Sequence, residues 1–178
     1  WGGNVEVAVK DETTAFGCAD ALEKIPDEIS MKEAVLAYLP CVSLKGVEMI
    51  NFTGNEKVLV IGAGMIGIST LQFLRILYPE IRLISLERNA FRADIAKKYA
   101  DCVIMNDQKA LSRILNETGG GADVIIECSG NPEVIPHLRE YLRDGGWTEQ
   151  GIGGGAPALI ESAEPRDAIA TGKTGRNA

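Results

Sequence analysis

The strongest constraint on the fold is a repeated alternation of apolar strands and helices that begins at Lys57. Residues 58–61 form a short, continuous apolar run that ends at Gly62, and such a run is typical of a central parallel strand covered on both faces. A helical pattern follows it, and the alternation then repeats. We expect strands at residues 81–86, 102–105 and 122–127, and helices at residues 66–77, 91–99, 110–117 and 132–144.

This alternation predicts an α/β fold built on a doubly wound parallel sheet, the Rossmann architecture. Right-handed crossovers set the strand order 3-2-1-4-5. A fifth strand is expected from Trp147 onward, although residues 148–150 are polar where a buried strand should be apolar. The residues after it are rich in Gly, Ala and charge, and we expect no sixth strand there. The sheet is therefore predicted to be truncated at its C-terminal edge.

The first 55 residues have a different pattern. Residues 5–9 alternate between valine and other side chains, which suggests a half-exposed strand. Residues 25–27 have the composition of a turn, and Ser30 with Glu33 forms a capping box that predicts the start of a helix. Pro40 would either interrupt that helix or begin the next one. We expect helices at residues 31–39 and 43–50.

Composition and charge exclude several classes of protein. Hydrophobic residues make up 46% of the 178-residue chain, which excludes disorder and allows a buried core. The 20 glycines have no period of three, so collagen is excluded. A net charge of −7 argues against a nucleic-acid partner, because backbone binding needs clustered Lys and Arg. An anionic cofactor is compatible with this charge, because local dipoles hold such a ligand.

The cysteines and the apolar segments indicate a cytoplasmic protein without a membrane partner. The four cysteines include no CxxC pair, so reduced thiols are the simplest interpretation. The longest uncharged stretch, residues 58–74, is just short of a membrane span and contains three glycines. The chain starts at Trp1 rather than at an initiator Met, so we interpret it as a fragment or a processed form.

A glycine-rich motif of the form GxGxxG follows the first of these strands and opens the next helix, as dinucleotide binding requires. Gly62 would permit a tight turn, Gly64 would let a pyrophosphate approach the backbone, and Gly67 would let the helix pack closely on the strand. Free N–H groups and the helix dipole would hold the phosphates. The alternative is a plain strand–helix turn. The candidate cofactor-binding residues here are Gly62, Gly64, Met65, Ile66 and Gly67.

Three charged residues follow the second strand. Glu87 lies 20 residues after Gly67, where a carboxylate accepts hydrogen bonds from the ribose hydroxyls of the adenosine. A carboxylate there repels a 2′-phosphate, so NAD is favoured over NADP. Arg88 leaves NADP open, because an arginine can pair with that phosphate. Arg92, one helical turn further on, would lie over the adenine, or both arginines would belong to a solvated helix face.

The ends of the fourth and fifth strands supply the remaining candidates. Ligands in open α/β sheets bind outside the carboxyl ends of the strands, at the switch point of the sheet. This rule brings the residues that follow these two strands toward the nicotinamide half of the cofactor. For the residues that follow the fifth strand, a flexible glycine loop is the competing interpretation. The candidates are Cys128, Ser129, Gly130, Ile152 and Gly153.

No catalytic residue and no metal site can be assigned from these residues. His137 is the single histidine and is expected in a surface helix. The chain has no cluster of His, Cys and Glu with metal-ligand spacing. Two alternatives to an enzyme that uses a dinucleotide cofactor remain open: a methyltransferase that binds S-adenosylmethionine in a similar glycine turn, and a dinucleotide-binding module without chemistry of its own.

Residues 57–67, Glu87 with Arg92, and residues 119–130 together resemble the medium-chain dehydrogenase/reductase family, which includes the zinc-dependent alcohol and polyol dehydrogenases. The resemblance covers about residues 1–155. It implies the cofactor-binding domain of an NAD(P)-dependent alcohol dehydrogenase-like oxidoreductase, which transfers a hydride between NAD(P) and an alcohol or carbonyl substrate.

The same resemblance divides the chain into three parts. Residues 1–50 correspond to the end of a catalytic domain with linking helices, residues 51–155 to the NAD(P)-binding Rossmann domain, and residues 156–178 to a polar tail. Leu39 stands where some members of the family have a zinc ligand, so zinc would be bound only by a catalytic domain outside this chain. We therefore expect the chain alone to be inactive or nearly so, with its oligomeric state open.

Overall fold

The computed structural model describes residues 24–150 and 158–161, with side chains for residues 24–143. The chain divides into two compact units, Trp1–Leu36 and Ala37–Ala178. In the part of the chain that the structure describes, no helix is both long and apolar enough to cross a membrane. The strand expected at residues 5–9 lies outside the described residues.

The first unit contains the helix α1 (Met31–Ala34). The capping box is confirmed, because the Ser30 N–H donates to Glu33 Oε2 at 2.9 Å and the Glu33 N–H donates to Ser30 Oγ at 3.3 Å. The expected turn is also present, with the Ile29 N–H donating to the Pro26 carbonyl. The prediction of one helix over residues 31–39 is wrong, since α1 ends at Ala34 and the next helix, α2 (Tyr38–Glu48), begins four residues later.

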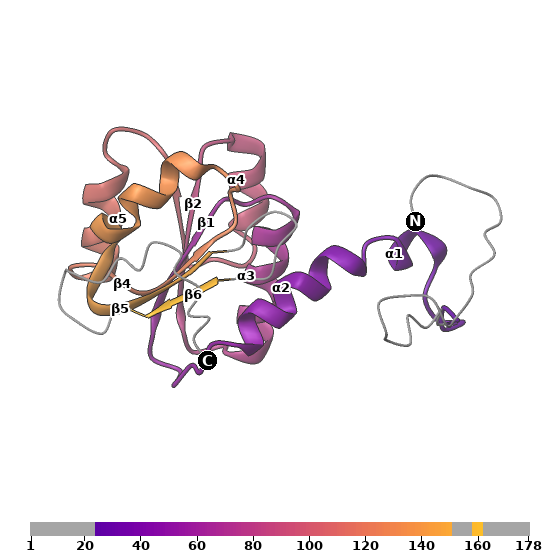
Figure 1. Cartoon of the computed structure of the whole chain (residues 1–178). Helices are drawn as coiled ribbons and strands as arrows, with labels where there is room; N and C mark the ends of the chain where they lie inside the picture. Colours follow the sequence, from indigo (N-terminus) through magenta and orange to yellow (C-terminus); the bar gives the residue numbers. More distant parts are fainter. Residues whose placement is uncertain (1–23, 151–157, 162–178) are drawn as a thin grey trace. The chain divides into compact units, whose positions relative to one another are not determined.

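The second unit is built on a sheet with the strand order β3-β2-β1-β4-β5-β6 (Figure 1). The first five strands in this order are parallel to their neighbours, whereas β6 is antiparallel to β5. The predicted parallel order 3-2-1-4-5 is confirmed. The strands are β1 (Lys57–Ile61), β2 (Arg82–Glu87), β3 (Cys102–Met105), β4 (Ala122–Glu127), β5 (Leu142–Gln150) and β6 (Ala158–Glu161).

Two expectations about the C-terminal edge of the sheet are wrong. A sixth strand is present, and it was missed because a four-residue segment in a Gly- and Ala-rich region has little periodicity of its own. The fifth strand also begins at Leu142 rather than at Trp147. Its pairing with β4 shifts register, because Ala122 pairs with Leu142 and Val124 pairs with Trp147. Such an irregularity depends on the partner strand rather than on the local sequence.

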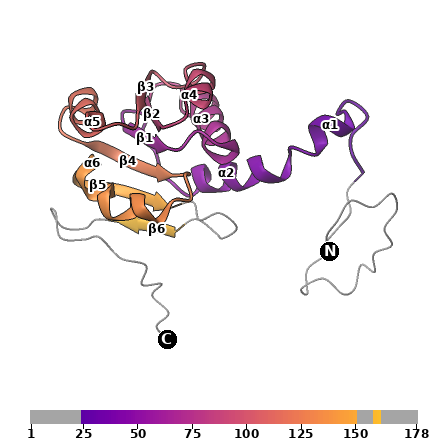
Figure 2. The same cartoon turned by 90° about the horizontal axis from the view of Figure 1, so that it is seen from above.

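Helices cover both faces of this sheet, with α3 (Met65–Leu77) and α4 (Ala90–Ala96) on one side and α5 (Ala110–Thr118) on the other (Figures 1 and 2). Two apolar clusters result: Val58, Val60 and Leu83 face α2, α3 and α4, and Leu59, Ile61 and Ile84 face α5 and α6. The helices of this unit are α2, α3 (Met65–Leu77), α4 (Ala90–Ala96), α5 (Ala110–Thr118), η1 (Pro132–His137) and α6 (Leu138–Tyr141).

Two helices differ from the expected pattern. The helix expected at residues 91–99 is α4, which ends at Ala96, and Phe91 in its first turn is 75% exposed. The segment that begins at Pro132 is a 3-10 helix followed by one short α-helix, and it ends at Tyr141 instead of at residue 144. Pro136 lies inside this segment and has no N–H to donate, which accounts for the break in the α-helical pattern.

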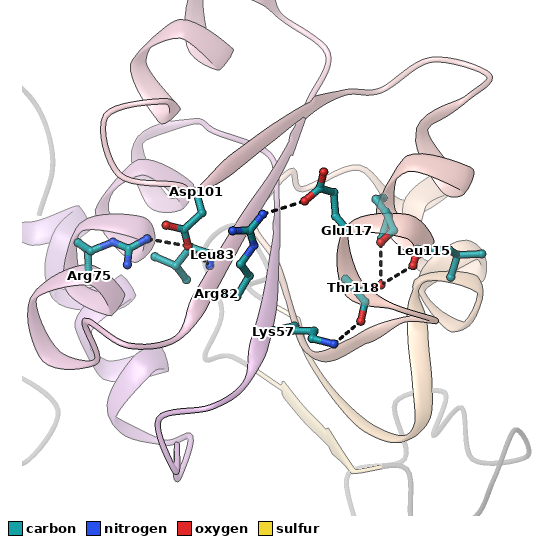
Figure 3. Close-up of polar contacts among 9 residues, drawn as sticks. Lys57, Arg75, Arg82, Leu83, Asp101, Leu115, Glu117 and Thr118 are labelled. Carbon is teal, nitrogen blue, oxygen red and sulfur yellow. Dashed lines mark hydrogen bonds and ion pairs between the residues drawn. The ribbon is translucent and has the colours of Figure 1, made fainter.

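Polar contacts join the elements at the amino ends of the strands (Figure 3). Asp101 lies just before β3, and its Oδ2 is 3.0 Å from Nη2 of Arg75 in α3. The same oxygen accepts a 2.7 Å hydrogen bond from the Leu83 N–H in β2. Lys57 at the start of β1 donates to the Thr118 carbonyl at the end of α5. The carboxyl ends of the parallel strands lie at the opposite edge and carry none of these contacts.

Candidate functional site

The turn between β1 and α3 is held on both sides by the neighbouring strands. The Gly62 N–H donates to the Leu86 carbonyl of β2 at 2.8 Å, and the Ile61 carbonyl accepts from the Cys128 N–H after β4 at 2.8 Å. Gly62 has a φ of +87°, a left-handed conformation that favours glycine. The tight turn expected at Gly62 is thus present, and it lies at the carboxyl edge of the sheet between β2 and β4.

The other two glycines of the motif have different surroundings. A Cβ added at Gly67 would lie 1.8 Å from the Gly62 carbonyl oxygen, so only glycine permits this close packing of α3 on the turn. A Cβ added at Gly64 would meet no atom within 4 Å. The backbone at Gly64 is therefore open to an approaching group, whereas the Gly62 carbonyl group fills the space beside Gly67.

The N-terminus of α3 is suited to binding an anion. Gly64 is the N-cap residue, and no side chain caps the helix. The first N–H groups of a helix have no acceptor within it, and the helix dipole places partial positive charge there. A phosphate group near Gly64 would accept hydrogen bonds from these N–H groups and would be attracted by the positive end of the helix dipole.

Glu87, at the end of β2, is buried with 4% of its surface exposed. Its Oε2 accepts a hydrogen bond from the Ala63 N–H at 2.5 Å, and its Oε1 accepts from the N–H groups of Arg88 and Asn89, each at 2.8 Å. The carboxylate therefore connects the glycine turn to the turn before α4. Oε1 accepts two of these hydrogen bonds and Oε2 accepts one, so a lone pair on Oε2 remains for one further donor.

A second buried carboxylate, Glu127, lies at the end of β4 on the other side of β1. Its Oε1 accepts from the Ser129 N–H at 2.7 Å, and Ser129 Oγ in turn accepts from the Asn131 N–H at 3.1 Å. A Cβ at Gly62 would lie 2.7 Å from the Ser129 Cα. The loop after β4 is thus packed directly against the glycine turn.

These turns surround a cleft of about 180 Å³ at the carboxyl edge of the sheet. This volume is smaller than the roughly 300–1,000 Å³ of a complete small-molecule pocket, so the cleft fits one part of a larger ligand. The predicted binding residues that line it are Gly62, Gly64, Glu87, Arg88, Arg92, Cys128 and Ser129.

The remaining predicted residues lie elsewhere or outside the described chain. Met65, Ile66, Gly67 and Gly130 do not line the cleft. Ile152 and Gly153 lie outside the described residues.

Several lining residues were missed from the sequence. Asn106 follows β3 directly, and Asn131 follows the Gly130 turn after β4. The rule that ligands bind beyond the carboxyl ends of parallel strands would have found both, had it been applied to every strand. The other missed lining residues are Ile61, Leu86 and Val134.

The described residues offer no metal site. No group of three or more His, Cys, Asp or Glu side chains in residues 24–143 is arranged to hold a metal ion. His137 lies in η1, where its Nδ1 is 2.8 Å from Glu140 Oε1, away from the lining of the cleft.

Comparison with known proteins places this architecture in a family. The family model described as zinc-binding dehydrogenase matches residues 65–169, which is more than half of the chain. D-xylulose reductase A from Aspergillus oryzae is 30% identical over 139 residues, which cover 74% of this chain and 38% of that protein. The chain therefore spans well under half the length of this relative.

Two solved structures share the fold. The 2R,3R-butanediol dehydrogenase from Bacillus subtilis is 25% identical with a TM-score of 0.62, and the match covers 75% of this chain and 40% of that enzyme. A short chain alcohol dehydrogenase from Escherichia coli CFT073, in complex with the cofactor NADH, is 26% identical with a TM-score of 0.66 and coverages of 78% and 42%. Together with the glycine turn and its cleft, these matches show that the chain belongs to the zinc-binding dehydrogenase family.

Proposed function

We propose that this chain is the cofactor-binding part of an NAD(P)-dependent, alcohol dehydrogenase-like oxidoreductase. The observation that carries the proposal is the open backbone at Gly64, which lies at the uncapped N-terminus of α3 and on the wall of the cleft. A dinucleotide places its pyrophosphate at such a position in a Rossmann fold.

The residues of the cleft divide between the two ends of the cofactor. Glu87, Arg88 and Arg92, which follow β2, would hold the adenosine. The loop after β4, with Cys128 and Ser129, would lie toward the nicotinamide, because it is on the other side of the glycine turn. Residues Gly130, Ile152 and Gly153 would complete that end, and Met65, Ile66 and Gly67 would contribute through the backbone of α3.

Each of these residues binds or orients rather than reacts. When bound, the nicotinamide ring accepts or donates the hydride. The α3 N–H groups hold the phosphates, and the packing of the β4 loop on Gly62 fixes the distance between the two halves of the cleft. NAD is the cofactor that Glu87 favours, because one remaining lone pair on Oε2 can accept from a ribose hydroxyl.

The other parts of the reaction are assigned to residues outside the cleft. The aligned relatives are much longer than this chain, and we place the substrate pocket, the acid–base residues and any zinc ligands in the additional length. Residues 1–50 would be the end of that catalytic domain, residues 51–155 the cofactor domain and residues 156–178 a tail. A cytoplasmic location with reduced thiols and a small-molecule substrate fits this role.

Calorimetric titration of the 178-residue chain with NADH, NADPH and S-adenosylmethionine tests the proposal. We expect saturable NADH binding, no binding of S-adenosylmethionine, and no reduction of NAD when an alcohol is added. Binding of S-adenosylmethionine alone would instead support a methyltransferase. If none of the three bound, the proposed function would be wrong.

A further inference from the structure

Glu127, at the end of β4, is a buried carboxylate whose hydrogen bonding is incomplete. Its surface is 3% exposed, and it makes no ion pair within residues 24–143. Oε1 accepts the Ser129 N–H, whereas Oε2 accepts no hydrogen bond from the part of the chain that the structure describes. A buried charge costs stability unless it is paired and hydrogen-bonded. The contact that this carboxylate does make, with Ser129, is therefore the feature that calls for a role.

Glu87 occupies the equivalent position on the other side of β1. Each glutamate is the last residue of a strand that neighbours β1, and each accepts from the N–H of the residue two positions later. Both oxygens of Glu87 accept hydrogen bonds, one of them from Ala63 in the glycine turn. Glu127 uses a single oxygen, so its contact is confined to its own loop.

The loop after β4 is held by a series of three similar contacts that begins at Glu127. Glu127 Oε1 accepts from the Ser129 N–H at 2.7 Å, and Ser129 Oγ accepts from the Asn131 N–H at 3.1 Å. Asn131 Oδ1 then accepts from the Glu133 N–H at 3.1 Å, which caps η1. Each side chain thus holds the N–H two residues further along, and local contacts of this kind fix the backbone of a turn.

This loop forms one wall of the cleft, to which Cys128, Ser129 and Asn131 contribute. Ser129 also packs against the glycine turn, where its Cα would be 2.7 Å from a Cβ added at Gly62. The series therefore sets the spacing between this wall and the turn. A ligand that binds between ordered walls loses less free energy to ordering them.

We propose that Glu127 is a positioning residue of the cofactor cleft, which holds the loop after β4 in its binding conformation through Ser129 and Asn131. This inference rests on the proposed dinucleotide-binding function. Glu127 itself does not line the cleft, so it acts on the cofactor through the loop. Its role requires one acceptor oxygen, which an amide also provides.

Calorimetric titration of the 178-residue chain with NADH, well below the unfolding temperature of each variant, tests this role. Glu127→Ala removes the acceptor, so NADH binding should weaken roughly tenfold. Glu127→Gln keeps one acceptor oxygen, so its affinity should stay within about threefold of the wild type. The unfolding temperature of Glu127→Gln should equal or exceed that of the wild type, because the charge that it removes has no partner among the described residues.

The series also predicts coupling between Glu127 and Ser129. Ser129→Ala removes the acceptor of the Asn131 N–H and should weaken NADH binding several-fold. Because both side chains act on one loop, the double variant should bind no more than about threefold more weakly than the weaker single variant. Losses that multiply in the double variant would overturn the inference.

Glu133→Ala is the matched control. It removes an exposed glutamate side chain from the same segment, and this side chain neither lines the cleft nor makes a hydrogen bond or ion pair within residues 24–143. NADH affinity should therefore be unchanged.

Two results would overturn the inference while leaving the proposed function intact. One is wild-type NADH affinity in Glu127→Ala. The other is a Glu127→Gln variant that binds as weakly as Glu127→Ala or unfolds at a lower temperature than the wild type, since the negative charge would then be what matters. A wild-type chain that bound no NADH would instead contradict the proposed function, and the inference with it.

Discussion

Glu87 Oε2 accepts a 2.5 Å hydrogen bond from the Ala63 N–H, and this contact ties the end of β2 to the glycine turn after β1. The other oxygen holds the turn that leads into α4. One buried side chain thus sets the relative position of two loops that border the cleft. Its role in this structure is to shape the site, in addition to any direct contact with ribose.

Glu87→Ala should lower the free energy of unfolding by about 2–4 kcal/mol, because three N–H groups lose a charged acceptor. Urea unfolding followed by circular dichroism measures this change. Glu80→Ala is the control: Glu80 is exposed, and its replacement should change stability by less than about 0.5 kcal/mol. Equal stabilities of the two variants would contradict the structural role of Glu87.

Gly64→Ala and Gly67→Ala should have different effects, the first mainly on the affinity for NADH and the second mainly on the stability of the fold. A methyl group at Gly67 collides with the Gly62 carbonyl, so this variant should lose about 1–3 kcal/mol of stability. A methyl group at Gly64 meets no protein atom, so stability should change by less than about 1 kcal/mol. Under the proposed function, NADH affinity should still fall on the order of tenfold in Gly64→Ala, since the methyl group stands where the pyrophosphate approaches.

Thermal unfolding and calorimetric titration of the two glycine variants measure these effects. An NADH affinity in Gly64→Ala equal to that of the wild type would place the phosphates elsewhere. A Gly67→Ala variant as stable as the wild type would contradict the close contact of α3 with the turn.

Ser85→Ala should be neutral or stabilising. The Ser85 hydroxyl is fully buried in β2 and has no hydrogen-bond partner among the residues that the structure describes, so its removal relieves a desolvation cost of about 1 kcal/mol. Ser43→Ala is the comparison, because Ser43 is also buried but its Oγ donates to the Ile66 carbonyl at 3.0 Å. That variant should lose about 1 kcal/mol, because the carbonyl loses its donor. Chemical denaturation of both proteins tests the difference, and the opposite order would contradict it.

Cys41 and Cys102 should react with iodoacetamide at different rates. Burial raises the pKa of the Cys102 thiol above its ordinary value of 9.0, and the side chain is half-buried, whereas Cys41 is exposed. At pH 8 the reactive thiolate of Cys102 is therefore scarcer, and Cys41 should be alkylated about tenfold faster. Mass spectrometry of the digested protein measures both rates. The difference should disappear in concentrated urea, and equal rates in the folded protein would contradict it.

Local sequence patterns were sufficient for the central strands and for the glycine turn. The strands at residues 102–105 and 122–127 match β3 and β4, because each is an apolar run bounded by polar residues or glycines. Gly62 and Gly67 have the expected turn and close packing, since no other residue type satisfies those two positions. These features depend on side-chain chemistry within a few residues.

The edge of the sheet and the polar partners depended on tertiary structure. The start of β5 follows from its irregular pairing with β4, and β6 is a strand because it pairs with β5. Nothing near Glu87 in the sequence indicates that its carboxylate is bound by Ala63, which is 24 residues away. The same holds for Asn106, which reaches the cleft because β3 lies beside β2.

The sequence by itself therefore determined the fold class, the strand order of the parallel sheet and the position of the glycine turn, because hydrophobic periodicity and glycine geometry are local properties. Only the tertiary structure decided which charges in the cleft are satisfied and which are free. Glu87 accepts hydrogen bonds from three N–H groups, while the guanidinium groups of Arg88 and Arg92 make no hydrogen bond or ion pair within residues 24–143. The physical reason is that the electrostatics of a site depend on groups brought together from distant segments, and charge in the sequence does not reveal its neighbours.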